Sequence, residues 1–330
     1  MTGERRSLAG SVEGVSDTDL GLRDWGELML VAGIFGSAFL WISLSLRSIS
    51  PETIAFGRVG LGAGALALVP AARCRIARSD IPRMLLASTV GVAAPVLLFG
   101  LAEERISSAL AGMMVAGMPA MAAIVAAIET RRFPERERLA GLTLGLAGVA
   151  LLAGPTLVGS TAEAGGVAMV ALAVLCYAVA TTLYAPLQQT YGSLRVTMWV
   201  LVFSTIVLFP LGIAGLRSSS IEPLPVIALA ILGVIGTGIV WAMFVGMVGR
   251  IGAVRSSIAG YLIPIIALVL GVVVLGEQVT PAQLLGIATA LAGGYLLSKR
   301  THRATDMPTA DEVFAGAPPE HVPPALEMCR

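Results

Sequence analysis

A succession of apolar runs that are nearly free of charge constrains this chain more than any other feature. The 330 residues are 56% hydrophobic and only 13% charged, whereas soluble domains carry about 25% charged residues. A bilayer core needs about 20 apolar residues per helix. The sequence therefore predicts an all-α integral membrane protein with ten transmembrane helices. The ten runs occupy residues 26–46, 51–71, 82–101, 106–128, 138–154, 166–186, 196–215, 224–246, 254–274 and 281–298.

The two ends and the cysteines restrict the class of protein further. Residues 1–25 are polar and predict a cytoplasmic tail, and residues 299–330, rich in proline and acidic residues, predict a disordered one. The three cysteines lie far apart, and both histidines fall in the C-terminal tail. This composition predicts no disulfide framework and no metal site. We expect no enzyme, no cofactor and no nucleic-acid partner.

Arginine and lysine gather at alternate loops. If the N-terminus is cytoplasmic, the loops that face outside hold only Arg47, Arg105 and Arg217. This asymmetry follows the positive-inside rule, and it predicts a multi-pass protein of the cytoplasmic (plasma) membrane with both termini in the cytoplasm. The cytoplasmic segments hold Arg5, Arg6, Arg23, Arg73, Arg75, Arg78, Arg83, Arg131, Arg132, Arg136, Arg138, Arg195, Arg250, Arg255, Lys299, Arg300 and Arg303.

The two halves of the chain align when one is shifted by 145 residues. Under this shift Gly91 meets Gly236, and Pro119 meets Pro264. Each half holds five spans, so the second half crosses the membrane in the opposite sense. Inverted repeats with a site near the midplane are typical of secondary transporters. We expect both prolines to interrupt their helices, because proline frees a backbone carbonyl that can line a cavity.

The chain resembles a known family at two stretches. These are "FGSAFLWISLSLRSISPETIAFGRVGLGAGALAL" (35–68) and the pattern of Pro, Leu-Gly-Glu, Thr, Gln and Gly over 264–293. They are similar to the EamA-type members of the drug/metabolite transporter superfamily. The resemblance covers one five-helix repeat at 26–154 and an inverted one at 166–298. It implies a central cavity, alternating access and, usually, export of small metabolites or drugs. The first copy departs from the pattern, with "ETRRFPE" at 129–135.

Arg58 is the sharpest candidate for a substrate contact. It lies about seven residues into the second span, where a charge costs about 2.5–3.5 kcal/mol on insertion scales. We expect it to face a cavity and to attract a carboxylate or phosphate. Snorkelling to the interface and pairing with a carboxylate are the structural alternatives.

Adjacent carboxylates close the third span. Glu103 and Glu104 are candidates for coupling to protons if they are buried beside a cavity, whereas a solvated loop is the plainer interpretation.

Aromatic residues provide candidate cavity walls, which suit small amphipathic ligands. An interfacial belt is the alternative. Met114 could line the same cavity or face lipid. The candidate aromatic residues are Trp41, Tyr177, Tyr184, Trp241, Phe244 and Tyr261.

The sequence therefore predicts a secondary transporter that exports a small organic metabolite, amino acid-like, or a drug. A channel or a lipid-translocating protein on the same scaffold is the alternative. The expected partners are a small-molecule substrate, the lipid bilayer and, as a candidate coupling ion, the proton. A monomer and a homodimer both remain open.

Overall fold

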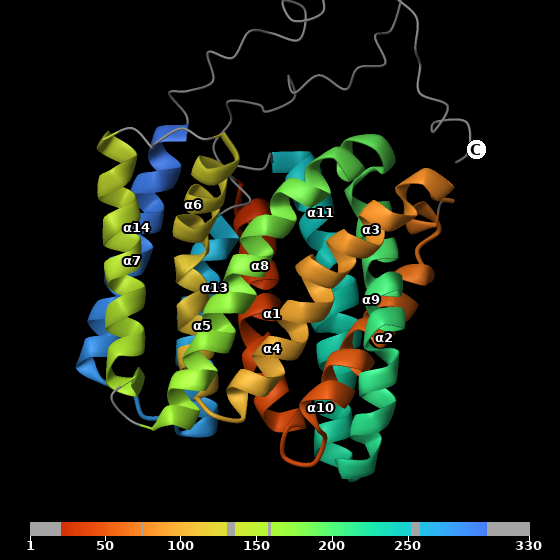
Figure 1. Cartoon of the computed structure of the whole chain (residues 1–330), viewed down its shortest axis with the longest axis horizontal. Coiled ribbons are helices and arrows are strands. Elements are labelled where there is room, and N and C mark those ends of the chain that lie inside the picture. Colours follow the sequence, from red (N-terminus) through yellow and green to blue (C-terminus); the bar gives the residue numbers. More distant parts are fainter. Residues whose placement is uncertain (1–20, 74, 131–135, 158–159, 252–257, 302–330) are drawn as a thin grey trace, which may run out of the picture.

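The computed structural model describes residues 21–73, 75–130, 136–157, 160–251 and 258–301 (Figure 1). Most of both predicted tails, the loop at 131–135 and Arg255 lie outside the described residues. In the described part every regular element is helical. Seven spans are single helices: α1 (Leu22–Ser45), α2 (Pro51–Ala67), α7 (Arg136–Leu157), α8 (Thr161–Tyr191), α9 (Ser193–Gly215), α13 (Ile258–Leu275) and α14 (Pro281–Thr301).

Three further spans each consist of two helices joined by a short segment of different pitch. These are α3 (Ile81–Ser88) with α4 (Ala94–Glu103), α5 (Ser108–Met114) with α6 (Met118–Thr130), and α10 (Pro223–Gly233) with α11 (Val240–Ile251). Seven stretches of the described chain are long and apolar enough to cross a membrane, and two shorter apolar helices follow at Ala259–Leu275 and Pro281–Leu297. With α2, which carries Arg58, they make the ten transmembrane helices of an all-α membrane protein.

Structural features recur at the 145-residue interval. A π-helical segment at Thr89–Ala93 interrupts the third span, and another at Val234–Ile239 interrupts the eighth. Packing follows the same relation: α2 lies against α9, and α7 against α14, so corresponding spans pair with each other. The contact of α1 with α10 likewise matches that of α8 with α4. The ten spans thus form two inverted five-helix repeats.

Glycines permit the closest of these contacts, between α7 and α14 at one edge of the bundle (Figure 1). A Cβ atom on Gly293 would collide with the backbone of Gly145, and one on Gly148 would collide with the backbone of Ala290. Small residues let helices approach where lipid supplies no hydrophobic drive for association. The seam fixes the fifth span of one repeat against the fifth of the other.

The helix boundaries depart from expectation at two places. The sixth span was predicted to end at residue 186, but α8 continues through Pro186 to Tyr191, and only Gly192, at φ +82°, separates it from α9. A helix likewise continues through Pro264 within α13. Pro119 follows a 3-10 turn at Val115–Gly117, so the fourth span alone shows the expected change of pitch near its proline.

The loops that follow α1, α4, α9 and α13 lie toward the lower end of the bundle in Figure 1, which we call the outer end because the sequence predicts that these loops face outside. Hydrogen bonds join the two repeats there. The N–H of Ser220 donates to the carbonyl of Ser48 (2.7 Å), and the N–H of Ser50 donates to Oγ of Ser219 (3.0 Å). These bonds hold the loop between α1 and α2 against the loop between α9 and α10.

Large apolar side chains remain exposed on the outside of the bundle. Val273 is 75% exposed, Ile206 60% and Leu285 60%. Exposure on this scale is a liability in water, and it is the expected surface of a helix bundle embedded in lipid.

Candidate functional site

A cavity of about 160 Å³ lies inside the bundle between the two repeats. The first repeat contributes Arg58, Gly91, Val92, Val96 and Met118 to its lining. The second contributes Tyr177, Thr181, Tyr184, Gln188, Val196, Thr197, Val200, Leu201, Thr237 and Trp241. Four of the predicted cavity residues therefore meet in one place: Arg58, Tyr177, Tyr184 and Trp241.

Arg58 is held by one hydrogen bond across the repeats. Its Nε donates to Oγ1 of Thr237 at 2.9 Å. The Thr237 hydroxyl in turn donates to the carbonyl of Leu232 at 2.9 Å, so its lone pairs face the guanidinium. Arg58 forms no ion pair with any residue that the structure describes. Its terminal nitrogens, which carry most of its donors, remain for a ligand in the cavity.

Both π-helical segments border the cavity. Gly91 and Val92 belong to the first, and Thr237 belongs to the second. A π-helical turn shifts the register of the side chains that follow it, and such turns occur frequently at functional sites. Val92 and Thr237 are counterparts under the 145-residue shift, and the counterpart of Arg58 is Phe203. The polar pair thus exists on one side only, which makes the cavity chemically asymmetric.

The aromatic walls depend on close packing around the first π-helical segment. The Tyr184 hydroxyl donates to the carbonyl of Ala87 at 3.2 Å, and it occupies the space that a Cβ atom on Gly91 would need. Tyr177 stacks on Phe99, with ring centroids 6.1 Å apart. Glycine at position 91 therefore allows the second repeat to place a phenol against the backbone of the first.

The other four candidates for cavity walls lie elsewhere in the bundle. Trp41 donates from Nε1 to Oγ of Ser37 in its own helix (3.2 Å), and Tyr261 donates to the carbonyl of Gly294 on α14 (2.9 Å). The Phe244 ring contacts Trp241 edge to face at 6.1 Å. Met114 is only 3% exposed and packs in the core. None of the four lines the cavity.

The adjacent carboxylates at the end of α4 have different surroundings. Both carboxylate oxygens of Glu103 are buried, and they accept no hydrogen bond. Glu104 is exposed. Partial burial raises the pKa of the Glu104 carboxyl, and the charge of Arg105 opposes that rise. Of the two, Glu103 has the environment that is unusual for a charged side chain.

Glu277 has a role that the sequence did not indicate. One of its carboxylate oxygens accepts from the N–H (2.9 Å) and Oγ (2.8 Å) of Ser108, and the other accepts from the N–H of Ala109 (2.8 Å). These donors lie at the first turn of α5, where backbone N–H groups lack partners within the helix. Glu277 thus joins the loop after α13 to the start of α5, across the two repeats.

Sequence reasoning also missed Thr237, Gly91, Thr181 and Gln188 among the lining residues. The alignment of Gly91 with Gly236 pointed at both π-helical segments. Helix packing is a sufficient explanation for the glycines of 233–238. For that reason the sequence did not single out Thr237, which lies among them and lines the cavity.

The comparison with known proteins agrees with this architecture. Residues 25–154 and 164–299 each match the EamA-like transporter family. The chain belongs to that family. Like the family, it is a membrane transporter built from two copies of one helical unit.

Relatives of this EamA-like transporter cover most of its length. An uncharacterized transporter of Archaeoglobus fulgidus is 25% identical over 279 residues, 84% of this chain and 100% of the relative. A probable terminal-alkyne amino-acid exporter of Streptantibioticus cattleyicolor is 27% identical over 284 residues, 83% of this chain and 93% of the relative. A solved structure, titled only as the crystal structure of a protein, shares the fold at a TM-score of 0.58 and 16% identity, covering 86% of this chain and 99% of its own.

Proposed function

We propose that this EamA-like transporter exports a small, amino-acid-like metabolite across the cytoplasmic membrane by alternating access. One observation carries the proposal: Arg58 holds a positive charge at a cavity between the repeats, with no carboxylate of the described chain paired to it. A charged side chain within a span is costly and marks a substrate pathway by default.

The chemistry of Arg58 favours a carboxylate in the substrate. A guanidinium presents a planar set of donors that matches a carboxylate in a two-point hydrogen bond. Thr237 engages Nε and leaves the terminal nitrogens for that contact. The relative from Streptantibioticus cattleyicolor, named as a probable exporter of a terminal-alkyne amino acid, supports the same substrate class.

The size and walls of the cavity favour a small metabolite over a drug. Its volume of about 160 Å³ is below the roughly 300–1,000 Å³ typical of pockets for drug-sized ligands. Tyr177, Tyr184 and Trp241 provide apolar faces for a short side chain beside the charge.

The position of the cavity supports loading from the predicted cytoplasmic side. Its lining reaches Gln188, near the end of α8, and Val196, near the start of α9, which lie away from the outer end. From the bonds of Ser48 with Ser220 and of Glu277 with Ser108, which join the two repeats, we infer that the outer end is closed. A substrate that enters from the cytoplasm and leaves when this end opens is exported.

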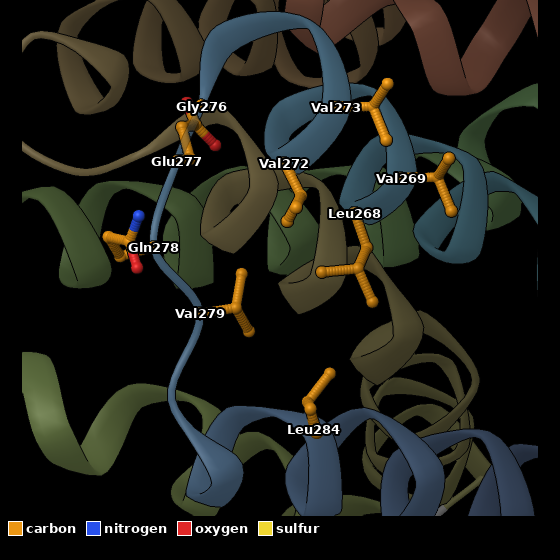
Figure 2. A pocket seen from close by; sticks show the side chains of 9 residues that line it. All are labelled: Leu268, Val269, Val272, Val273, Gly276, Glu277, Gln278, Val279 and Leu284. Atoms are coloured by element: carbon orange, nitrogen blue, oxygen red, sulfur yellow. The ribbon is translucent and has the colours of Figure 1, made fainter.

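A groove on the bundle, lined by α13 and the loop that follows it, does not favour a lipid translocator. Figure 2 shows it between α13 and the loop that leads to α14, a volume of about 490 Å³. Leucine and valine dominate its walls, with Glu277 and Gln278 along the loop. A path for a lipid headgroup needs polar walls through the depth of the bilayer, so the carrier is the better interpretation.

Export can be tested in cells that express native protein, Arg58→Ala or Arg217→Ala at equal membrane levels. Arg217 is an exposed arginine at the outer end and serves as the control. We expect at least one compound with both an amine and a carboxylate to accumulate in the medium with native protein and Arg217→Ala, but not with Arg58→Ala. If the compound accumulates equally with Arg58→Ala, export does not depend on the guanidinium of Arg58, and that part of the proposal is wrong.

Orientation has its own test. A membrane-impermeant thiol reagent should label Gln278→Cys in intact cells, whereas Arg83→Cys should react only after permeabilisation. Both positions are exposed, and they lie at opposite ends of their spans. Labelling of both from the same side would contradict the inverted arrangement in the membrane.

A further inference from the structure

Glu103 is the buried acidic group that the proposed substrate site does not use. It is the last residue of α4, and neither carboxylate oxygen reaches water or a hydrogen-bond donor of the described chain. An ionised carboxylate that is buried without partners costs many kcal/mol, so such a group becomes neutral or moves. Glu103 therefore needs an explanation that packing alone does not give.

Neighbouring groups leave little to stabilise a negative charge on Glu103. The charges that act on it most are those of Glu277 and Arg58. Glu277 is itself a carboxylate, and it accepts three hydrogen bonds from Ser108 and Ala109. Arg58 is the cation of the two, but no ion pair joins its guanidinium to the carboxylate of Glu103.

Apart from Arg58, the described elements packed against α4 carry no cation near Glu103. Among the described residues, α5 and the π-helical segment Thr89–Ala93 carry no titratable side chain, and those of α1 lie in its first two turns, at the end away from Glu103. On its own chain segment Arg105 follows Glu104 and bonds the carbonyl of Leu101. The remaining titratable groups are Glu52 and Arg58 on α2 and Glu163, Cys176, Tyr177, Tyr184 and Tyr191 on α8.

The place of Glu103 in the fold links its charge to the outer end. The end of α4 packs on the start of α2, where a Cβ on Gly100 would lie 3.3 Å from Cβ of Pro51. The start of α8 packs on it from the other side, since a Cβ on Gly166 would lie 3.3 Å from the carbonyl oxygen of Ala102. Opening of the outer end would separate these elements and expose Glu103 to water.

We propose that Glu103 binds one proton each time the outer end closes and exchanges it with external water each time that end opens. Closure buries the side chain as a neutral carboxylic acid, and opening rehydrates it, so that its O–H bond breaks to give a carboxylate and a hydrated proton. This deepens the proposed function, because it makes the outward-open state of the exporter sensitive to external pH. Low external pH favours the closed outer end.

The conformational equilibrium tests this without any substrate. Spin labels at Arg47→Cys and Gln278→Cys, in a chain whose native cysteines are replaced by serine, report the separation of outer loops from the two repeats; both positions are exposed. The purified protein is placed in lipid nanodiscs, and the distance distribution is measured from pH 5 to pH 8. One linked proton changes the ratio of closed to open forms by up to tenfold per pH unit.

The expected result is a closed population that grows as the pH falls in the native background. Glu103→Gln should hold the closed form at every pH, and the neighbouring Glu104→Gln should keep the native response. If Glu103→Gln does not fold, Glu103→Asp replaces it and should retain the one-proton slope with a shifted midpoint. A native distribution that does not change with pH, or a native slope that survives in Glu103→Gln, overturns the proposal. Failure of the export assay would not affect this readout.

Discussion

The Nε atom of Arg58 lies 2.9 Å from the hydroxyl of Thr237, and this one hydrogen bond joins the second span of the first repeat to the π-helical segment of the second. It fixes the guanidinium at the cavity wall, and no carboxylate of the described residues forms an ion pair with it. The sequence halves match at 145 residues, yet the counterpart positions hold Phe203 and Val92. The two repeats thus share a fold, but the pair of Arg58 and Thr237 has no counterpart at the matching positions.

Thr237→Val removes the acceptor but nearly keeps the side-chain volume. Hydrogen bonds to charged groups contribute about 1.5–3 kcal/mol, so we expect the substrate KM to rise about ten- to hundredfold with a smaller change in maximal rate. Transport kinetics of the compound found in the export assay measure this. Thr205→Val is the matched control, because its hydroxyl bonds only the carbonyl of Leu201 (2.7 Å) in its own helix. An unchanged KM in Thr237→Val would show that Thr237 does not contribute to substrate binding.

The contact between Gly91 and Tyr184 predicts a rescue. Gly91→Ala introduces a Cβ where the Tyr184 hydroxyl lies, and overpacking of this kind costs about 1–3 kcal/mol. We expect transport to fall in Gly91→Ala and to recover partly in Gly91→Ala with Tyr184→Phe, because the second change removes the nearest colliding atom and leaves those of the Tyr184 ring and the Ala180 side chain. A double-mutant cycle on transport rate measures the coupling. Additive losses would show that the two positions act independently.

The seam between α7 and α14 predicts a specific loss of stability. Gly293→Val places methyl groups against the backbone of Gly145, and we expect it to lower the free energy of unfolding by about 1–3 kcal/mol or to prevent assembly. Gly154→Val is the control on α7, because a Cβ there meets nothing within 4 Å. Thermal unfolding in detergent compares the two variants. Equal stability of both would argue against a tight seam.

Tyr191 predicts a loss of stability at alkaline pH. It is 3% exposed, its hydroxyl donates to Asp80 (2.6 Å), and the N–H of Ala77 donates to it (3.2 Å). Burial raises the pKa of this phenol, and the hydrogen bond to Asp80 raises it further. The pKa of the phenol is therefore higher in the folded state than in the unfolded state, where it is about 10. The contribution of Tyr191 to the free energy of unfolding is complete below about pH 10 and is lost as the pH rises through the folded-state pKa.

Tyr191→Phe should therefore be less stable than native protein at pH 7, by about 1 kcal/mol, and the difference should shrink above pH 10. Thermal unfolding at pH 7 and pH 11 measures it, with the exposed Tyr295→Phe as control. A difference that stays constant with pH would show that the phenol does not titrate with unfolding.

The spans could be predicted because the lipid bilayer determines both the length of the charge-free runs and the side of the membrane on which arginine gathers. Lipid excludes charges and unpaired backbone groups, so each span appears in the sequence as a long apolar run with few charges. The end of α8 was harder: Pro186 reads as a stop, but a helix tolerates it where neighbouring groups satisfy the freed carbonyl. The π-helical segments have no such mark, since Thr89–Ala93 and Val234–Ile239 resemble ordinary apolar helix.

Of the candidate site, the sequence singled out most clearly Arg58, whose charge is costly to place within a membrane span. Arg58 is conspicuous because a charge inside a span must have a purpose, whereas Thr237 is ordinary in composition and becomes important only through its position. Glu103 and Glu104 are indistinguishable as neighbours in sequence. Tertiary packing buries one and exposes the other. Of six aromatic candidates, spacing along the chain could not separate Tyr177 at the cavity from Tyr261, which bonds α14.

The central claim is that Arg58 recognises a carboxylate in a transported substrate. The most direct measurement is counterflow in proteoliposomes that contain purified protein, with radiolabelled amino acids compared against the amines that lack the carboxylate. We expect native protein and Arg217→Ala to exchange one or more of the amino acids, with the matching amines at least tenfold slower and Arg58→Ala inactive. Exchange of amines and amino acids at equal rates, or undiminished exchange by Arg58→Ala, would contradict the account.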